Sequence, residues 1–107
     1  MKTTFRLPCE LRAAMRNAAR KAYGPKGKSR WVREALEQLF KEDPALGSVG
    51  AAEDLAQNDA LDMVDLGNRL PSYIENAIMH LRRQDPLMEG VQSLIIRAAI
   101  RHRLSTL

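Results

Sequence analysis

Hydrophobic and polar residues alternate over the first seven positions of the chain. One side of this segment carries Thr3, Phe5 and Leu7, and the other carries Lys2, Thr4 and Arg6. A two-residue alternation is typical of a β-strand with one buried face. A single short strand leaves its backbone groups unpaired, so the pattern also indicates that this strand pairs with another one.

The spacing of apolar residues changes to that of a helix after Pro8, which suits the first turn of a helix. The apolar stripe of this first helix is Leu11, Met15, Ala18, Ala19 and Ala22. Gly24 and Pro25 end it, and Ser29 is expected to be the N-cap of a second helix. The stripe of the second helix is Val32, Ala35, Leu36, Leu39 and Phe40. Residues 1–42 are therefore predicted to form one unit of strand, helix, turn and helix.

The same pattern returns later in the chain, after an Ala- and Gly-rich linker over residues 43–60. Leu70-Pro71 matches Leu7-Pro8 at an offset of 63, and the first helical stripe repeats at that offset. With one inserted residue, Ser93 matches Ser29. We therefore predict an internal duplication with a second unit over residues 61–107.

The strand of this second unit is less regular than the first. Val64 and Leu66 alternate, but Gly67 interrupts the pattern before Leu70-Pro71. A bulge or a shortened strand is expected there.

A chain of 107 residues with 45% hydrophobic content fits one compact domain. Units of about 50 residues bury too little surface to be stable alone, so the two copies are expected to interlock. They can pair within one chain or with a second chain, and the pattern leaves both open. The predicted fold is mainly α with a short antiparallel β-ribbon and a pseudo-two-fold axis.

The net charge of +4 is distributed unevenly along the chain. Residues 1–42 hold 11 Lys and Arg against 4 acidic residues, whereas residues 43–107 hold 6 against 9. The basic first unit favours a polyanionic partner, with nucleic acid first.

Several classes of protein are disfavoured by what the sequence lacks. There is no apolar run of about 20 residues and no apolar leader, which predicts a cytoplasmic protein that does not enter a membrane. Cys9 is the only cysteine, and His80 and His102 have no companions at metal-ligand spacing, so no disulfide, metal or cofactor is expected. No set of converging titratable residues or glycine-rich phosphate loop appears, so we expect neither catalytic residues nor a small-molecule substrate.

The order of short strand, Leu-Pro, amphipathic helix, glycine-containing turn and a helix beginning SRWVREAL resembles the ribbon-helix-helix family, the fold class of the Arc and MetJ repressors. The resemblance covers residues 2–42 fully and residues 61–104 in their helices. Two such units in one chain resemble some plasmid-transfer accessory proteins and some regulators of mobile elements. The resemblance implies binding to double-stranded DNA by a β-ribbon in the major groove, and a location at the nucleoid or a plasmid.

The polar side of the first strand supplies the predicted base contacts, Lys2, Thr4 and Arg6. In the second unit, the offset of 63 assigns Arg69 to the same role and puts Gly67 and Asp65 at the other two positions. A carboxylate is repelled by DNA phosphates, so an asymmetric operator with one strong and one weak half is our hypothesis.

Phosphate contacts are expected at the start of each second helix, because free backbone N–H groups and the helix dipole favour an anion there. The residues are Lys28, Ser29 and Arg30 in the first unit, and Gln92 and Ser93 in the second. The second set has no adjacent Lys or Arg.

These contacts predict a sequence-specific DNA-binding protein, in the first place a transcriptional repressor. One alternative is an accessory DNA-binding protein for plasmid transfer or partition, which would use the same chemistry. The other is an antitoxin-type adaptor, which usually needs a disordered tail to wrap its toxin. About three residues follow the predicted last helix, which disfavours the adaptor.

Overall fold

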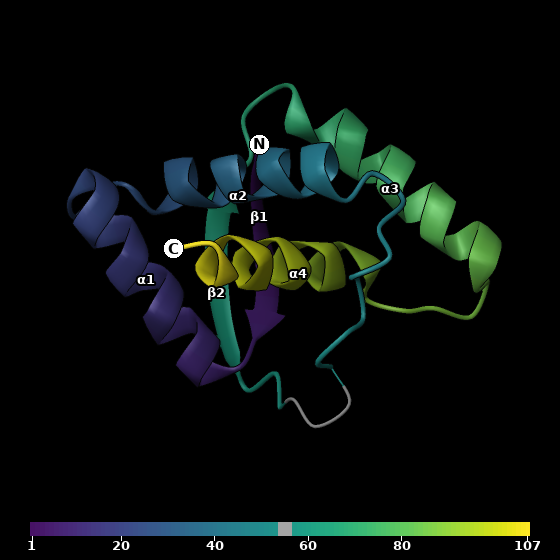
Figure 1. Ribbon diagram of the computed structural model, residues 1–107, viewed down its shortest axis with the longest axis horizontal. Helices are drawn as coiled ribbons and strands as arrows, with labels where there is room; N and C mark the ends of the chain where they lie inside the picture. Colours follow the sequence, from purple (N-terminus) through teal and green to yellow (C-terminus); the bar gives the residue numbers. More distant parts are fainter. Residues whose placement is uncertain (54–56) are drawn as a thin grey trace.

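Four helices and a two-stranded sheet make up the described part of the chain, residues 1–53 and 57–107 of a computed structural model (Figure 1). In chain order the elements are β1 (Lys2–Leu7), α1 (Cys9–Tyr23), α2 (Lys28–Glu42), β2 (Ala60–Asp65), α3 (Leu70–Gln84) and α4 (Val91–Ser105). The prediction of a mainly helical fold with a short antiparallel ribbon is confirmed.

The two strands of the single chain pair with each other. They are antiparallel, with a register that runs from Lys2 opposite Asp65 to Leu7 opposite Ala60. The alternation in β1 has the expected result, because Phe5 and Leu7 are buried. In this structure the ribbon is therefore formed by two strands of one polypeptide.

The second strand lies earlier in the sequence than the match to Leu70-Pro71 predicts. β2 ends at Asp65, and Leu66 to Arg69 connect it to α3, with Gly67 at a φ of +71°. In β2 the buried positions are Asp62 and Val64, and Leu66 continues the same face. The assignment of residues 67 and 69 to the strand was wrong, because a loop separates β2 from the helix.

The turn between α1 and α2 fixes where α2 begins. The N-cap of α2 is Gly27, and a Cβ there would lie 2.3 Å from Cβ of Tyr23, so only glycine fits this close approach. The prediction that Ser29 is the N-cap was therefore wrong, and Ser29 lies inside the first turn.

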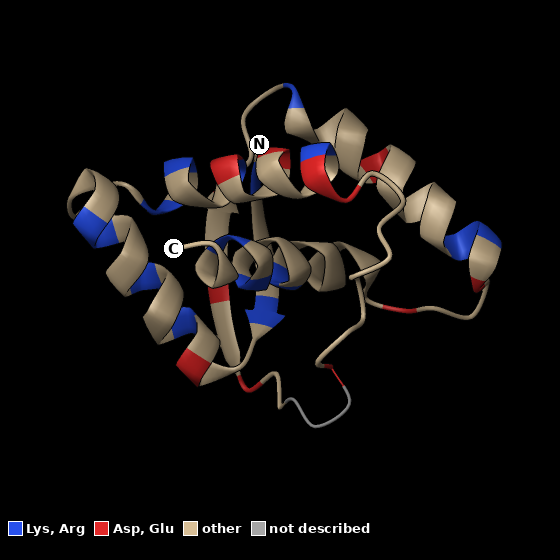
Figure 2. Cartoon of the chain, viewed as in Figure 1, with Lys and Arg blue, Asp and Glu red and all other residues tan. Residues whose placement is uncertain are grey.

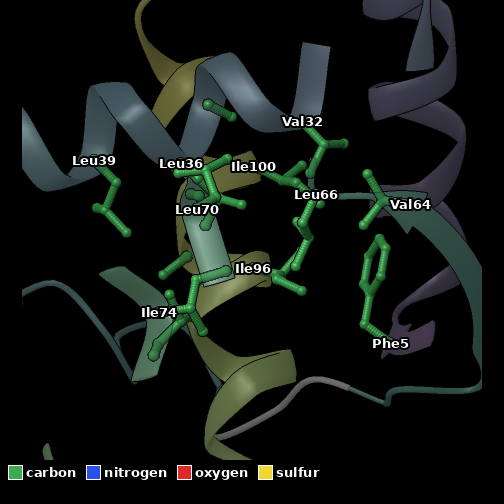
Figure 3. Close-up of a cluster of buried hydrophobic side chains, with 14 of the residues drawn as sticks. Phe5, Val32, Leu36, Leu39, Val64, Leu66, Leu70, Ile74, Ile96 and Ile100 are labelled. Atoms are coloured by element: carbon green, nitrogen blue, oxygen red, sulfur yellow. The ribbon is translucent and has the colours of Figure 1, made fainter. Parts of the chain in front are cut away.

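The core lies between the ribbon and the helices α2 and α4. These two helices run antiparallel to each other and cover one face of the ribbon, with α1 and α3 on either side (Figure 1). Figure 3 shows side chains from both strands and from α2, α3 and α4 meeting in this layer. Fully buried members include Phe5, Leu36, Leu66, Ile96 and Ile100. Because one face of the ribbon packs against the core, the side chains of its other face lie at the surface.

Candidate nucleic-acid interface

The outer face of β1 carries three exposed polar side chains, Lys2, Thr4 and Arg6. Within the described residues, no ion pair or side-chain hydrogen bond engages any of them. Their positions agree with the alternation seen in the sequence. Two cations and a hydroxyl therefore project from the ribbon without side-chain partners in the part of the chain that the structure describes.

The outer face of β2 is different from that of β1. Leu61 is 52% exposed and Met63 is 47% exposed, and they lie opposite Arg6 and Thr4 in the register. Asp65 lies opposite Lys2 at the other end. Sequence reasoning missed both apolar residues, although their alternation with Val64 and Leu66 is the signal that would have found them.

The carboxylate of Asp65 serves the loop that follows β2. Its Oδ1 atom accepts from the backbone N–H of Gly67 at 3.0 Å and from the amino group of Met1 at 3.1 Å. These two contacts lower the pKa of Asp65 below its ordinary value. The group is charged at neutral pH and held in place at one end of the ribbon.

Arg69 does not lie on the ribbon. It is the N-cap of α3, its side chain is 85% exposed, and its Nη2 atom lies 3.8 Å from Oε1 of Glu37. The prediction that Arg69 contacts a base from the second strand therefore has no geometric support, because Arg69 lies after the loop that follows β2.

The start of α2 lies beside β2 and makes direct contacts with it. Nζ of Lys28 is 2.6 Å from Oδ1 of Asp62, and the hydroxyl of Ser29 accepts from the backbone N–H of Asp65 at 3.0 Å. Arg30 stacks over the ring of Tyr23, 4.0 Å from its centroid. Of the three residues predicted to contact phosphate, Lys28 and Ser29 therefore join α2 to β2, whereas Arg30 contacts Tyr23 of α1 and lies 3.5 Å from Glu34.

Asp62 is a carboxylate on the buried face of the ribbon, only 6% exposed. Its oxygens lie 2.6 Å from Lys28 Nζ, 3.1 Å from Arg16 Nε and 3.5 Å from Arg12 Nε. Burial alone would raise the pKa of Asp62, but the hydrogen bonds from Arg16 and Lys28 outweigh burial and hold the pKa below its ordinary value. This buried anion orders a set of cations along the β2 side of the ribbon.

A basic hollow of about 180 Å³ opens next to this cluster, between the end of α1 and the start of α2. Its lining residues are Arg16, Ala19, Arg20, Gly24, Pro25 and Lys28. Figure 2 shows Lys and Arg positions along α1 and at the start of α2, on the side of the ribbon where β2 lies. The first backbone N–H groups of α2 also lack intrahelical partners, so the hollow suits an anion of the size of a phosphate group.

The start of α4 carries no such cluster. Gln92 and Ser93 lie half-buried in its first turn, after the N-cap Gly90. The nearest cation along this helix, Arg97, is 7% exposed and donates to the backbone oxygen of Arg6 at 2.8 Å. The two predicted phosphate positions are therefore unequal in charge.

Comparisons of the chain with family models, with curated proteins and with solved structures give no match. The interpretation of this surface therefore rests on its own residues and geometry. In the described part of the chain, no group of three His, Cys, Asp or Glu is arranged to hold a metal ion. None of the described helices has the length and apolar character needed to cross a membrane.

Proposed function

We propose that this protein binds double-stranded DNA by inserting the outer face of its β-ribbon into the major groove. The observation that carries the proposal is the row of Lys2, Thr4 and Arg6, which are exposed on the outer face of β1 and have no side-chain partner among the described residues. A two-stranded ribbon fits the roughly 12 Å width of the major groove and directs every second side chain toward the base edges.

We further propose that the chain is a tandem ribbon-helix-helix protein with a pseudo-two-fold axis through the ribbon. Two crosswise hydrogen bonds support this arrangement. Arg33 Nη1 donates to the backbone oxygen of Asp65, and Arg97 Nη1 donates to that of Arg6, both at 2.8 Å. Each second helix thus holds the strand of the other unit, as two interlocked copies require.

The basic hollow supports a phosphate contact on the β2 side of the ribbon. Arg20 lines it beside Arg16 and Lys28, which share the charge of Asp62. Phosphate contacts fix the position of a protein on DNA and carry no sequence information, whereas contacts from the ribbon to the bases do. The two sets of residues are therefore assigned separate roles, Arg20 in affinity and Arg6 in specificity.

The biological role that best fits such binding is that of a transcriptional regulator, acting as a repressor at its own site. An accessory role at a transfer or partition site of a plasmid would use the same contacts. The identity of the bound DNA site would distinguish these roles, so the first experiment is to identify that site.

The test is selection of a site from a randomised duplex library, followed by fluorescence anisotropy on the selected and a scrambled duplex. Lys2→Ala/Arg6→Ala should lose roughly tenfold or more in preference for the selected site, because Arg and Lys donate to guanine O6 and N7. The charge-matched control is Arg82→Ala/Arg83→Ala, two exposed positions at the end of α3. Equal losses in both variants, or selection of no site, would refute ribbon contact and favour protein binding.

Arg20→Ala tests the phosphate contact. We expect it to weaken the selected and the scrambled duplex by the same factor and to reduce the slope of log K against log salt by about one. Lys41→Ala, at the far end of α2, is the control for loss of one charge. A change in sequence preference without a change in salt slope would contradict the assignment of Arg20 to a phosphate.

A further inference from the structure

We propose that Leu61 and Met63 recognise thymine, by packing against the 5-methyl groups of thymine bases in the major groove. The inference rests on the DNA binding proposed above and adds to it the base that the second strand selects. Thymine is the one base whose major-groove edge carries a methyl group, and apolar side chains are its natural partners.

The exposure of these two residues is what calls for an explanation. Leu61 and Met63 are 52% and 47% exposed on the outer face of a strand whose inner face already supplies the core. Exposed single apolar residues are common on protein surfaces. These two, however, are consecutive positions of the face that carries Lys2, Thr4 and Arg6, and they replace polar residues at the corresponding places of β1.

The charges around the pair favour DNA as the occupant. Arg6 is the cross-strand neighbour of Leu61, and Lys2 lies on the same outer face of the ribbon. A protein interface needs about 800 Å² from each partner, which two side chains set among cations do not provide. Contact with a thymine methyl group, by contrast, requires only one apolar side chain, and DNA as a polyanion is compatible with the neighbouring cations.

The register also predicts the spacing of the selected bases. Cβ atoms of cross-strand neighbours lie about 4.5–5.5 Å apart, and base pairs are separated by about 3.4 Å. A thymine contacted by Leu61 should therefore lie one or two base pairs from the guanine contacted by Arg6. Met63 lies two residues further along β2, about 6.6 Å away, so a second thymine is expected about two base pairs beyond the first.

Asp65 completes the asymmetry of the ribbon. Its Oδ1 atom is engaged by Gly67 and Met1, so the acidic end of β2 is tied to the protein. The recognition supplied by β2 then comes from Leu61 and Met63, and the operator should have a guanine-containing part next to a thymine-containing part.

The experiment replaces single thymines of the selected site by deoxyuridine, which removes the methyl group and leaves base pairing unchanged. At the two contacted positions, each replacement should weaken binding about fourfold, the effect of one buried methyl group. At the other thymines the change should be below twofold. Leu61→Ala/Met63→Ala should bind the thymine and deoxyuridine duplexes equally, because the variant lacks the side chains that contact the methyl groups.

The matched control is Met79→Ala/Leu87→Ala, which removes the same two residue types from exposed positions on α3 and in the loop after it. This variant should keep the full sensitivity to deoxyuridine. The inference is overturned, with DNA binding intact, if Lys2→Ala/Arg6→Ala loses the site but deoxyuridine has no effect anywhere. If no site is selected at all, the proposed function and this inference fail together.

Discussion

Arg97→Ala is expected to lower the free energy of unfolding by about 4 kcal/mol, since removing one partner of a buried ion pair typically costs 3–5 kcal/mol. Arg97 is 7% exposed and joins three parts of the chain. It donates to the backbone oxygen of Arg6 in β1 at 2.8 Å, and its Nη2 atom lies 2.6 Å from Oε1 of Glu53 in the linker. The alanine variant removes the donor to the backbone oxygen of Arg6 and leaves Glu53 with Arg101 alone.

Urea unfolding followed by circular dichroism measures this loss. The matched control is Arg33→Ala, because Arg33 makes the corresponding bond to Asp65 but has no buried carboxylate partner among its contacts in the described residues. We expect the control to cost about 1 kcal/mol, the usual value of one hydrogen bond. Arg97→Lys should recover little of the loss, because an ammonium group cannot reach the carbonyl and the carboxylate together as a guanidinium does. Equal costs for Arg33→Ala and Arg97→Ala would show that Glu53 adds nothing.

The local pattern of the chain was sufficient to predict most of its elements. The alternation around Phe5 predicted β1, and the stripe around Leu36 predicted α2, because a period of two or of 3.6 residues follows directly from the geometry of the backbone. The repeat of this pattern predicted the helices of the second half. The predicted start of α2 differs from the observed one by one or two residues, because the close approach of Gly27 to Tyr23 fixes where this helix begins.

The position of β2 was not predictable from the Leu-Pro match. In the proposed duplication, Leu7 corresponds to Leu66, at an offset of 59, whereas α3 corresponds to α1 at an offset of 63 and α4 to α2 at an offset of 64. The additional residues form the loop that contains Gly67 and Arg69. The position of β2 was also hard to recognise from the sequence, because Asp62 stands at a buried position where the alternation predicts an apolar residue.

The candidate interface was predicted on the first strand but missed on the second, because the Leu-Pro match placed the second strand too late in the sequence. Lys2, Thr4 and Arg6 follow from alternation alone, whereas Leu61 and Met63 require the correct offset. The contacts of Lys28 and Ser29 with β2 join residues more than thirty positions apart. Such contacts depend on the tertiary structure, and a local pattern does not encode them.

Asp62→Asn is expected to have opposite effects on stability and on DNA binding. The carboxylate is buried and contacts Arg12, Arg16 and Lys28, so its removal should lower the free energy of unfolding by about 2–3 kcal/mol. The cost stays below that of Arg97→Ala because the three cations are partly exposed and water can solvate them.

The stability difference should depend on pH. The pKa of Asp62 is lowered in the folded state, so its contribution is fully present above the ordinary aspartate pKa of about 3.9 and is lost as the pH falls through the folded value. The native chain and the variant should therefore differ most above about pH 5 and converge in acid. Urea unfolding at several pH values measures this, with Glu89→Gln as a control for the same change of charge at an exposed position. A difference that persists unchanged in acid would mean that the ionised carboxylate is not the source of the stability.

DNA binding should change in the other direction, because Arg16 and Lys28 lose their counter-charge beside the basic hollow. Under conditions where the variant stays folded, we expect Asp62→Asn to bind a scrambled duplex several-fold more tightly, with a salt slope steeper by up to about one. Glu89→Gln adds the same charge far from the ribbon and should change neither quantity by as much. If Asp62→Asn binds DNA more weakly in proportion to its unfolded fraction, Asp62 only supports the fold. A gain in affinity instead means that the buried carboxylate limits how strongly the ribbon side of the protein attracts phosphates.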